Sequence, residues 1–200
     1  ESILQHAQRG STILATADSN TAVDNLVEKL MDLKCKVVRI GNPARLSETI
    51  APASLDQQVE DDPDYQQAAS MRDMVADIRE AQQPHLKPTG QARRGLSDDQ
   101  ILKLSRKGAT ARGVSQANIH RLAEWIHLQR QINGLMEESR RLEKKAVNSI
   151  LREAEVICAT NSAAGSELLA HQTFDAVFID EATQSMEPSC LIPMVKGKKW

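Results

Sequence analysis

The spacing of apolar positions changes twice over residues 1–40. Residues 11–16 (Ser-Thr-Ile-Leu-Ala-Thr) and 36–40 (Lys-Val-Val-Arg-Ile) are short apolar runs of the kind found in buried strands. From Ala22 to Leu33, apolar residues recur every three or four positions, which predicts a helix. A strand, a helix and a strand within about thirty residues predict a βαβ unit with parallel strands and a right-handed crossover.

A different pattern follows the second strand. Residues 54–83 are acidic with apolar residues at helical spacing, and residues 115–154 continue that spacing long enough to predict one long helix. Between them, residues 85–113 are basic and rich in Pro and Gly around a short helical stretch at 97–106. The two helical stretches are expected to pair antiparallel as a stalk, with Trp125 packed inside it. The basic segment is either an electrostatic contact with nucleic acid or, as for most charge runs, a solvated surface.

The strand pattern returns after the long helix. Residues 155–160 (Glu-Val-Ile-Cys-Ala-Thr) predict a third strand, and residues 175–179 predict a fourth that is buried on both faces of a parallel sheet. The expected fold class is therefore α/β, with a parallel sheet interrupted by an inserted α-helical stalk. We expect the first part of the sheet domain at residues 1–50, the stalk at 51–153, and the second part of the sheet domain at 154–200.

Two adjacent carboxylates, Asp180 and Glu181, directly follow the fourth strand. Ligand sites in open α/β sheets lie at the carboxyl ends of the strands. Asp180 is suited there to hold Mg²⁺ through an oxygen or a bound water, and Glu181 to orient or deprotonate an attacking water. Gln184 follows within reach of the metal or of a neighbouring motif. This pattern is typical of a Walker B element in a nucleotide-hydrolysing motor, although strands of many α/β proteins end in carboxylates without this chemistry.

Polar residues also follow the first and third strands. Ser19 and Asn20 precede the predicted helix, whose free N–H groups and positive dipole end can bind a phosphate. Thr160, Asn161 and Gly165 follow the third strand. Each group alone is most often a helix cap or a turn. Several such groups on one side of one sheet, however, predict a track for a nucleic-acid backbone.

Composition restricts how nucleic acid is bound. The formal charge of −2 and the pI of about 6.3 give no global basic field, so contact with nucleic acid is expected to be local and to involve phosphates. Only 2% of the residues are aromatic, which argues against an aromatic base-stacking platform.

The cysteines indicate a cellular compartment. Cys35, Cys158 and Cys190 are far apart and form no C-x-x-C pair, so they are expected to be buried apolar residues in a reducing environment. No stretch approaches the about 20 apolar residues of a membrane span, so we expect no membrane partner. The expected localisation is intracellular.

Four segments resemble motifs of superfamily 1 helicases of the Upf-like group, most closely its Smubp-type members. One resembles motif Ia, commonly A-P-S-N-x-A-V-D-N-L, with Ala17 and Asp18 in place of the usual single Pro. The four segments, the last of which resembles motif II, are residues 15–26, 38–45, 156–165 and 179–188. They fall in the family's order, and the helical insertion lies where these helicases carry an inserted stalk.

The resemblance implies a RecA-like P-loop NTPase fold and an ATP-dependent 5′-to-3′ helicase acting on single-stranded DNA or RNA. It implies that Asp180 coordinates the Mg²⁺ of Mg-ATP, that Glu181 positions or activates the hydrolytic water, and that Gln184 couples nucleotide state to neighbouring motifs. It also implies a second RecA-like domain of the same polypeptide, with arginine fingers. The residues that it places on the phosphates of the strand are Ser19, Asn20, Thr160 and Asn161.

No G-x-x-x-x-G-K-[ST] P-loop occurs in the sequence. The first residues continue a helical pattern and residues 196–200 are turn-like, so we expect the middle of a longer protein. The isolated piece is expected neither to bind ATP tightly nor to unwind nucleic acid. Two alternatives stay open: a chromosome-maintenance ATPase with a coiled-coil insertion, whose L-S-G-G-Q-like signature is absent here, and a non-catalytic α/β scaffold whose stalk binds partners.

Overall fold

The computed structural model describes residues 2–41 and 47–198, which divide into two compact units. The first unit comprises the described residues up to Asp62 and from Lys145 onward, and the second comprises Pro63–Lys144. Three predicted features lie partly outside the described residues. They are the turn after the second strand, the helicase-like segment at residues 38–45, whose residues 42–45 are not described, and the terminal turn, whose last two residues are not described. Within those ranges, no helix is both long enough and apolar enough to cross a membrane.

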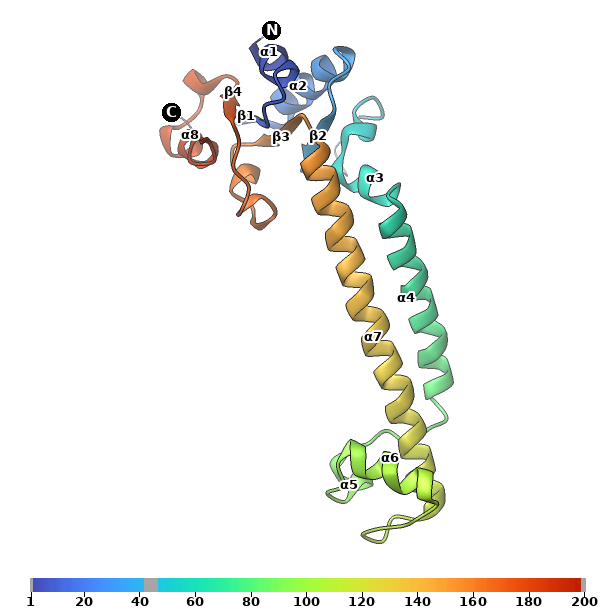
Figure 1. The fold of residues 1–200 in the computed structure, drawn as a ribbon. Helices are drawn as coiled ribbons and strands as arrows, with labels where there is room; N and C mark the ends of the chain where they lie inside the picture. Colours follow the sequence, from blue (N-terminus) through green and yellow to red (C-terminus); the bar gives the residue numbers. More distant parts are fainter. Residues whose placement is uncertain (1, 42–46, 199–200) are drawn as a thin grey trace. The chain divides into compact units, whose positions relative to one another are not determined.

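In the first unit, the described residues form a four-stranded parallel sheet (Figure 1). Its strands are β1 (Ile13–Ala17), β2 (Val37–Ile40), β3 (Val156–Thr160) and β4 (Ala176–Ile179). The strand order is β2-β3-β1-β4, so β3 lies between the two strands of the predicted βαβ unit. The predicted α/β class with a parallel sheet is confirmed.

Helices α1 (Ser2–Gln8) and α2 (Asn20–Asp32) pack against one face of this sheet. The buried side of α2 includes Val23, Val27 and Leu30, at the helical spacing found in the sequence. β1 is buried along its whole length. Burial of each aliphatic side chain stabilises the fold by about 1.5–3 kcal/mol, so this apolar layer holds α2 against the strands.

β4 forms one edge of the described sheet and pairs with β1. Its four residues are all half-buried, so the expectation of a strand buried on both faces is wrong for this structure. Between β3 and β4 lie the 3₁₀ helices η3 (Ala163–Gly165) and η4 (Glu167–Leu169). After β4, η5 (Ala182–Gln184) leads to α8 (Glu187–Met194), which packs near β4 and η3.

The second unit contains a helical hairpin. α4 (Pro63–Gln82) runs antiparallel to the part of α7 (Gln116–Glu153) that lies in this unit (Figure 1). Ser139 Oγ donates to the carbonyl of Ala68 at 3.1 Å, and Gln82 Nε2 donates to that of Trp125 at 3.2 Å. These bonds link the helices at two levels, as the predicted stalk requires.

The acidic stretch predicted as one helix is two helices. A short helix, α3 (Leu55–Glu60), ends before α4 begins at Pro63. A residue before proline is disfavoured in the helical conformation, while proline itself suits the first helical position. The break at Asp61 and Asp62 therefore has a local cause that the apolar spacing did not reveal.

The turn of the hairpin carries α5 (Gly90–Arg93), which the sequence did not predict, and α6 (Asp98–Lys107), which it did. Ile101 from α6 and Leu122 from α7 lie in its apolar core, and Trp125 packs against this cluster. The expectation that Trp125 is a packing residue of the hairpin is confirmed.

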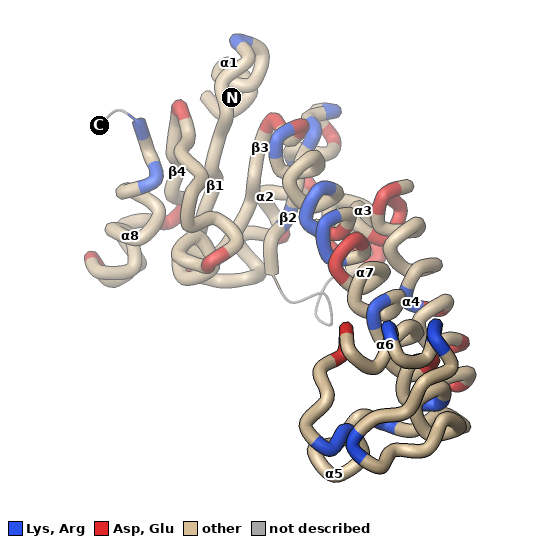
Figure 2. The backbone as a smooth tube through the Cα atoms, turned by 60° about the horizontal axis from the view of Figure 1, so that its bottom comes forward, with Lys and Arg blue, Asp and Glu red and all other residues tan. Residues whose placement is uncertain are grey.

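Basic residues of this turn hold its loops together. Arg94 Nη1 donates to the carbonyls of Arg112 and Gly113 at 3.4 and 3.3 Å, and Arg112 Nη1 donates to those of Arg94 and Gly95 at 3.3 and 3.1 Å. Figure 2 shows Lys and Arg positions around α5 and α6. Part of the predicted basic surface is thus used for internal structure.

Candidate active site and nucleic-acid edge

The carboxyl ends of β1, β3 and β4 lie side by side at one edge of the sheet. β1 pairs in parallel register with both neighbours. Just beyond the strands, the backbone N–H of Asp180 donates to the carbonyl of Thr16 at 2.7 Å, and that of Asn161 donates to the carbonyl of Ala17 at 2.9 Å. The structure therefore brings the three polar groups predicted from sequence to a common edge.

Asp180 has the exposure and the oxygen donors of a magnesium ligand. Its side chain is exposed, and Oδ1 accepts the backbone N–H of Glu181 at 3.1 Å. Among the described residues, no group of three or more His, Cys, Asp or Glu is arranged to hold a metal ion. A single carboxylate fits Mg²⁺, which keeps several waters and takes further ligands from substrate phosphates. The residues present thus fit a nucleotide-bound Mg²⁺.

Glu181 has a left-handed backbone, with φ 53° and ψ 31°. For a residue other than glycine this conformation costs about 1–2 kcal/mol, and such strain is concentrated at functional sites. The turn leads into η5, where the N–H of Gln184 donates to the carbonyl of Glu181 at 2.9 Å. The side chains of Glu181 and Gln184 are exposed and therefore accessible to a ligand at this edge.

A pocket of about 260 Å³ adjoins Asp180. It is smaller than the about 300–1,000 Å³ of most ligand pockets. It is lined by Ser2, Ile3, Leu26, Phe178, Ile179 and Asp180. This edge therefore offers carboxylates beside a pocket that is small for a nucleotide.

Ser19 is the N-cap of α2, as the sequence predicts. Its Oγ accepts the N–H of Ala22 at 3.1 Å, and its backbone is extended. This bond satisfies one of the four free N–H groups of the first turn, and the Ser hydroxyl still has its own proton to donate. Ser19 and Asn20 are both exposed, so the positive end of α2 is open to an anion.

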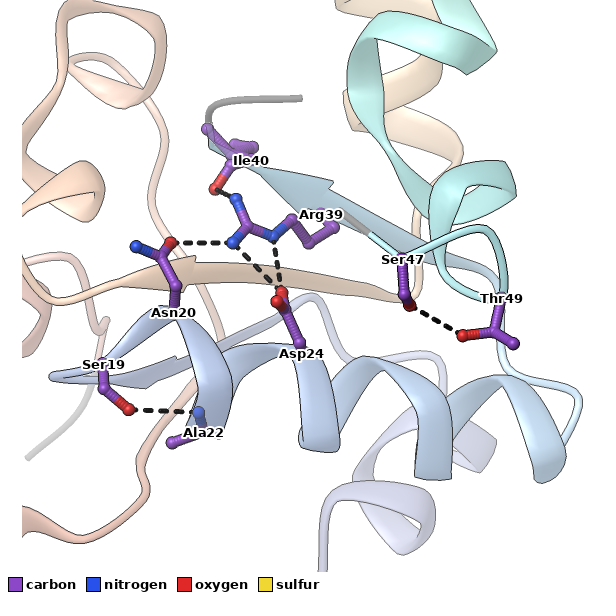
Figure 3. A network of polar contacts seen from close by, with 8 residues as sticks. All are labelled: Ser19, Asn20, Ala22, Asp24, Arg39, Ile40, Ser47 and Thr49. Carbon is purple, nitrogen blue, oxygen red and sulfur yellow. Dashed lines mark hydrogen bonds and ion pairs between the residues drawn. The ribbon is translucent and has the colours of Figure 1, made fainter. Parts of the chain in front are cut away.

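Arg39 is a site residue that the sequence pattern did not reveal. It lies in β2 and is 2% exposed. Its Nη2 donates to Asn20 Oδ1 at 2.8 Å, its Nε donates to Asp24 Oδ1 at 3.1 Å, and its Nη1 donates to the carbonyl of Ile40 at 3.2 Å (Figure 3). The available signal was an arginine inside an otherwise apolar strand, because a buried cation needs partners.

The three residues predicted after β3 differ in accessibility. Thr160 is half-buried, and its Oγ1 accepts the N–H of Ala163 at 3.2 Å. Asn161 is fully buried, and its amide has no hydrogen-bond partner among the described residues. Gly165 is exposed, but a Cβ there would lie 2.9 Å from Ile192 Cγ2, so close packing on α8 already favours glycine. Asn161 would have to turn outward to reach a phosphate.

The cysteines are free, but only one is fully buried. Cys158 is buried, whereas Cys35 and Cys190 are half-buried, so the expectation of three buried cysteines is wrong for two of them. Burial raises the pKa of the Cys158 thiol to about 12. Burial and the nearby Glu155 also raise the pKa of Cys35. Neither thiol is a candidate nucleophile, because the thiolate is the reactive form.

Comparison with known proteins defines the class. The model of a family described as "AAA domain" matches residues 2–200, and the chain belongs to this family. An uncharacterized ATP-dependent helicase of Methanocaldococcus jannaschii is 44% identical over 191 residues, which cover 94% of this chain and 28% of the relative. DNA-binding protein SMUBP-2 of Mesocricetus auratus is 34% identical over 203 residues, covering 100% of this chain and 17% of the relative.

A regulator of nonsense transcripts 1 homolog of Drosophila melanogaster is 29% identical over 191 residues, covering 95% of this chain and 12% of the relative. Together these matches confirm the kinship predicted from the motifs: the chain is a superfamily 1 helicase sequence of the Upf-like, Smubp-type group. It spans 28% of the length of the archaeal relative and smaller shares of the other two.

Proposed function

We propose that this chain supplies the metal-binding and strand-binding edge of an ATP-dependent 5′-to-3′ helicase motor acting on single-stranded DNA or RNA. One observation carries the proposal. Asp180 is hydrogen-bonded through its backbone to β1, the strand that leads directly into Ser19 and Asn20. A shift of the backbone at Asp180 can therefore be transmitted through this hydrogen bond and β1 to the N-terminus of α2. Relatives named ATP-dependent helicase and DNA-binding protein support the same activity.

In this proposal the two carboxylates divide the chemistry. Asp180 holds the Mg²⁺ of Mg-ATP, directly or through a water, and the ion neutralises charge on the phosphates when bound. Glu181 orients or deprotonates the attacking water, which its exposed position beside Asp180 allows. Gln184, one turn further on, couples the nucleotide state to neighbouring motifs.

In this proposal the chain binds single-stranded nucleic acid through the phosphates of its backbone. Ser19 and Asn20 contribute at the N-terminus of α2, Thr160 and Gly165 contribute beyond β3, and Asn161 joins them if its amide turns outward. Phosphate contacts carry no sequence information directly, so binding is expected to be independent of base identity. This mode of binding does not require an aromatic platform that stacks on the bases.

The wider organisation is also a proposal. Residues 1–50 and 154–200 form a RecA-like domain, and residues 51–153 form its inserted stalk. The compact second unit at Pro63–Lys144 supports the middle of this stalk, whereas residues 51–62 and 145–153 group with the sheet in the first unit. A second RecA-like domain of the same polypeptide completes the nucleotide site with arginine fingers. The protein works inside the cell.

The test is ATP hydrolysis by the full-length polypeptide, with and without single-stranded DNA or RNA oligonucleotides. Hydrolysis is expected to be stimulated by the strand and to fall by about 10²–10⁴-fold in Glu181→Gln, because the water loses its base. Glu28→Gln is the matched control, since it makes the same change at an exposed acid of α2 that lies outside the four helicase-like segments. Absence of hydrolysis in the wild type would favour the scaffold alternative. Full activity of Glu181→Gln would remove the role assigned to that residue.

A further inference from the structure

The partners of Arg39 lie on one face of α2. The guanidinium bonds Asn20 at 2.8 Å and Asp24 at 3.1 Å, residues that are four positions apart and therefore one helical turn apart. The side chain of Asp24 is 25% exposed, so the ion pair is only partly open to water. A buried cation thus holds β2 against the first two turns of α2.

This contact decides which way the Asn20 amide faces. A guanidinium has donors but no acceptor, so the amide oxygen must be the atom that meets it. Nδ2 then lies on the opposite side of the amide, away from Arg39, as Figure 3 shows. An NH₂ group donates hydrogen bonds and a phosphate oxygen accepts them. The opposite amide orientation would present an oxygen to the strand and repel it.

Gly41 leaves the room that the guanidinium of Arg39 occupies. A Cβ at this position would overlap Arg39 Nη1, so a larger residue there displaces the guanidinium. Lysine cannot substitute for it, because one ammonium lacks the planar fork that reaches Asn20, Asp24 and a carbonyl together.

We propose that Arg39 is a positioning residue for strand binding: it holds Asn20 with its donor group outward, so that the N-terminus of α2 is ready for a phosphate. This inference rests on the proposed function, since it assigns Asn20 to the nucleic-acid backbone. A side chain held in its binding orientation loses less rotamer freedom on binding, which is how Arg39 raises affinity without touching the strand.

A double-mutant cycle on the full-length protein tests the proposal, with affinity for a labelled single-stranded oligonucleotide measured by fluorescence anisotropy. Asn20→Ala and Arg39→Lys are each expected to weaken binding about ten-fold, the loss of one hydrogen bond to a charged group. The double variant is expected to bind no more weakly than Asn20→Ala, because Arg39 acts through Asn20. Arg9→Lys, at an exposed position of the same unit, is the matched control and should bind as the wild type does.

A purely structural role for Arg39 predicts a different result. The two losses would then multiply in the double variant, and that outcome, or wild-type affinity of Arg39→Lys, overturns the proposal. Gly41→Ala keeps the arginine but displaces its guanidinium, so it should reproduce the loss and decides the matter if Arg39→Lys does not fold. Wild-type affinity of Asn20→Ala would also overturn the proposal. Strand-stimulated ATP hydrolysis in that same variant would show that the motor function itself survives.

Discussion

Ser189 donates a hydrogen bond from its Oγ to Asp18 Oδ1 at 2.8 Å. Asp18 lies between β1 and Ser19, and Ser189 lies in α8, the helix that follows the carboxylate pair. The bond therefore joins the candidate strand-binding loop to the segment after the candidate metal site. It also accommodates the acidic residue that lengthens the motif Ia-like loop, because the Asp18 carboxylate is turned toward α8.

Removing the charge of Asp18 should strengthen strand binding. Asp18→Asn keeps an oxygen to accept the Ser189 hydroxyl but removes a negative charge near the phosphates, where such a charge costs up to about 1 kcal/mol in water. We expect affinity for a single-stranded oligonucleotide to rise about two- to three-fold at low salt, with the gain shrinking as salt screens the charge. Affinity measured as a function of salt checks this.

The control for this prediction is Asp32→Asn. Asp32 is exposed at the opposite end of α2, so the same change in net charge occurs far from the N-terminus of the helix. An equal gain in both variants would mean that overall charge, rather than the position of Asp18, governs binding.

Because the backbone of Glu181 is strained, replacing this residue by glycine should raise the stability of the fold and abolish ATP hydrolysis. Glycine adopts the left-handed backbone without penalty, so Glu181→Gly is expected to stabilise the fold by about 1 kcal/mol while abolishing ATP hydrolysis. Glu181→Gln should lose activity without gaining stability, because its backbone stays strained. Thermal unfolding and hydrolysis of the full-length variants test this pair of outcomes.

A matched glycine substitution in an ordinary helical position should do the opposite. Glu28 is exposed inside α2, and Glu28→Gly is expected to destabilise by about 1 kcal/mol. If Glu181→Gly also destabilises the protein, its backbone does not carry the strain inferred from its φ angle.

Features set by local sequence were predicted well. The helix with Val23, Val27 and Leu30 on its buried side and the cap at Ser19 depend on neighbours within one or two turns, and the structure confirms both. The acidic pair after β4 was likewise placed correctly at a carboxyl strand end, because parallel strands leave little choice of where a following loop emerges.

Features set by distant contacts were not predicted. The insertion of β3 between β1 and β2 and the half-buried state of β4 depend on strand order, which apolar runs do not encode. Arg39 looked like one polar residue in a strand until the fold brought it to Asn20 and Asp24. The inward turn of Asn161 is of the same kind, since its position in the motif carries no information about burial.

Cys158 should react only when the sheet opens. Its pKa of about 12 and its complete burial leave neither thiolate nor access in the folded protein. At pH 8, maleimide labelling mapped by mass spectrometry is expected to modify the half-buried Cys190 first, Cys35 more slowly because its pKa is raised, and Cys158 only in denaturant. Equal labelling of Cys158 in the native state would show that β3 is not a protected interior strand.

Asp175 should make the stability of the fold depend on pH in the acidic range. The backbone N–H of Thr12, the side chain of Lys198 and the Thr12 hydroxyl all donate to this carboxylate and lower its pKa to about 2. Because an unfolded Asp titrates near 4, the stabilising contribution is present above about pH 4 and is lost as pH falls toward 2. Asp175→Asn should therefore unfold at a lower temperature than the wild type at pH 7, and the difference should shrink toward pH 2.

Thr12→Val keeps the backbone donor, which is the largest cause of the lowered pKa, and should preserve most of the pH dependence. A gap between Asp175→Asn and the wild type that stays constant from pH 7 to pH 2 would mean that the Asp175 charge is not what ties β4 to the residue before β1.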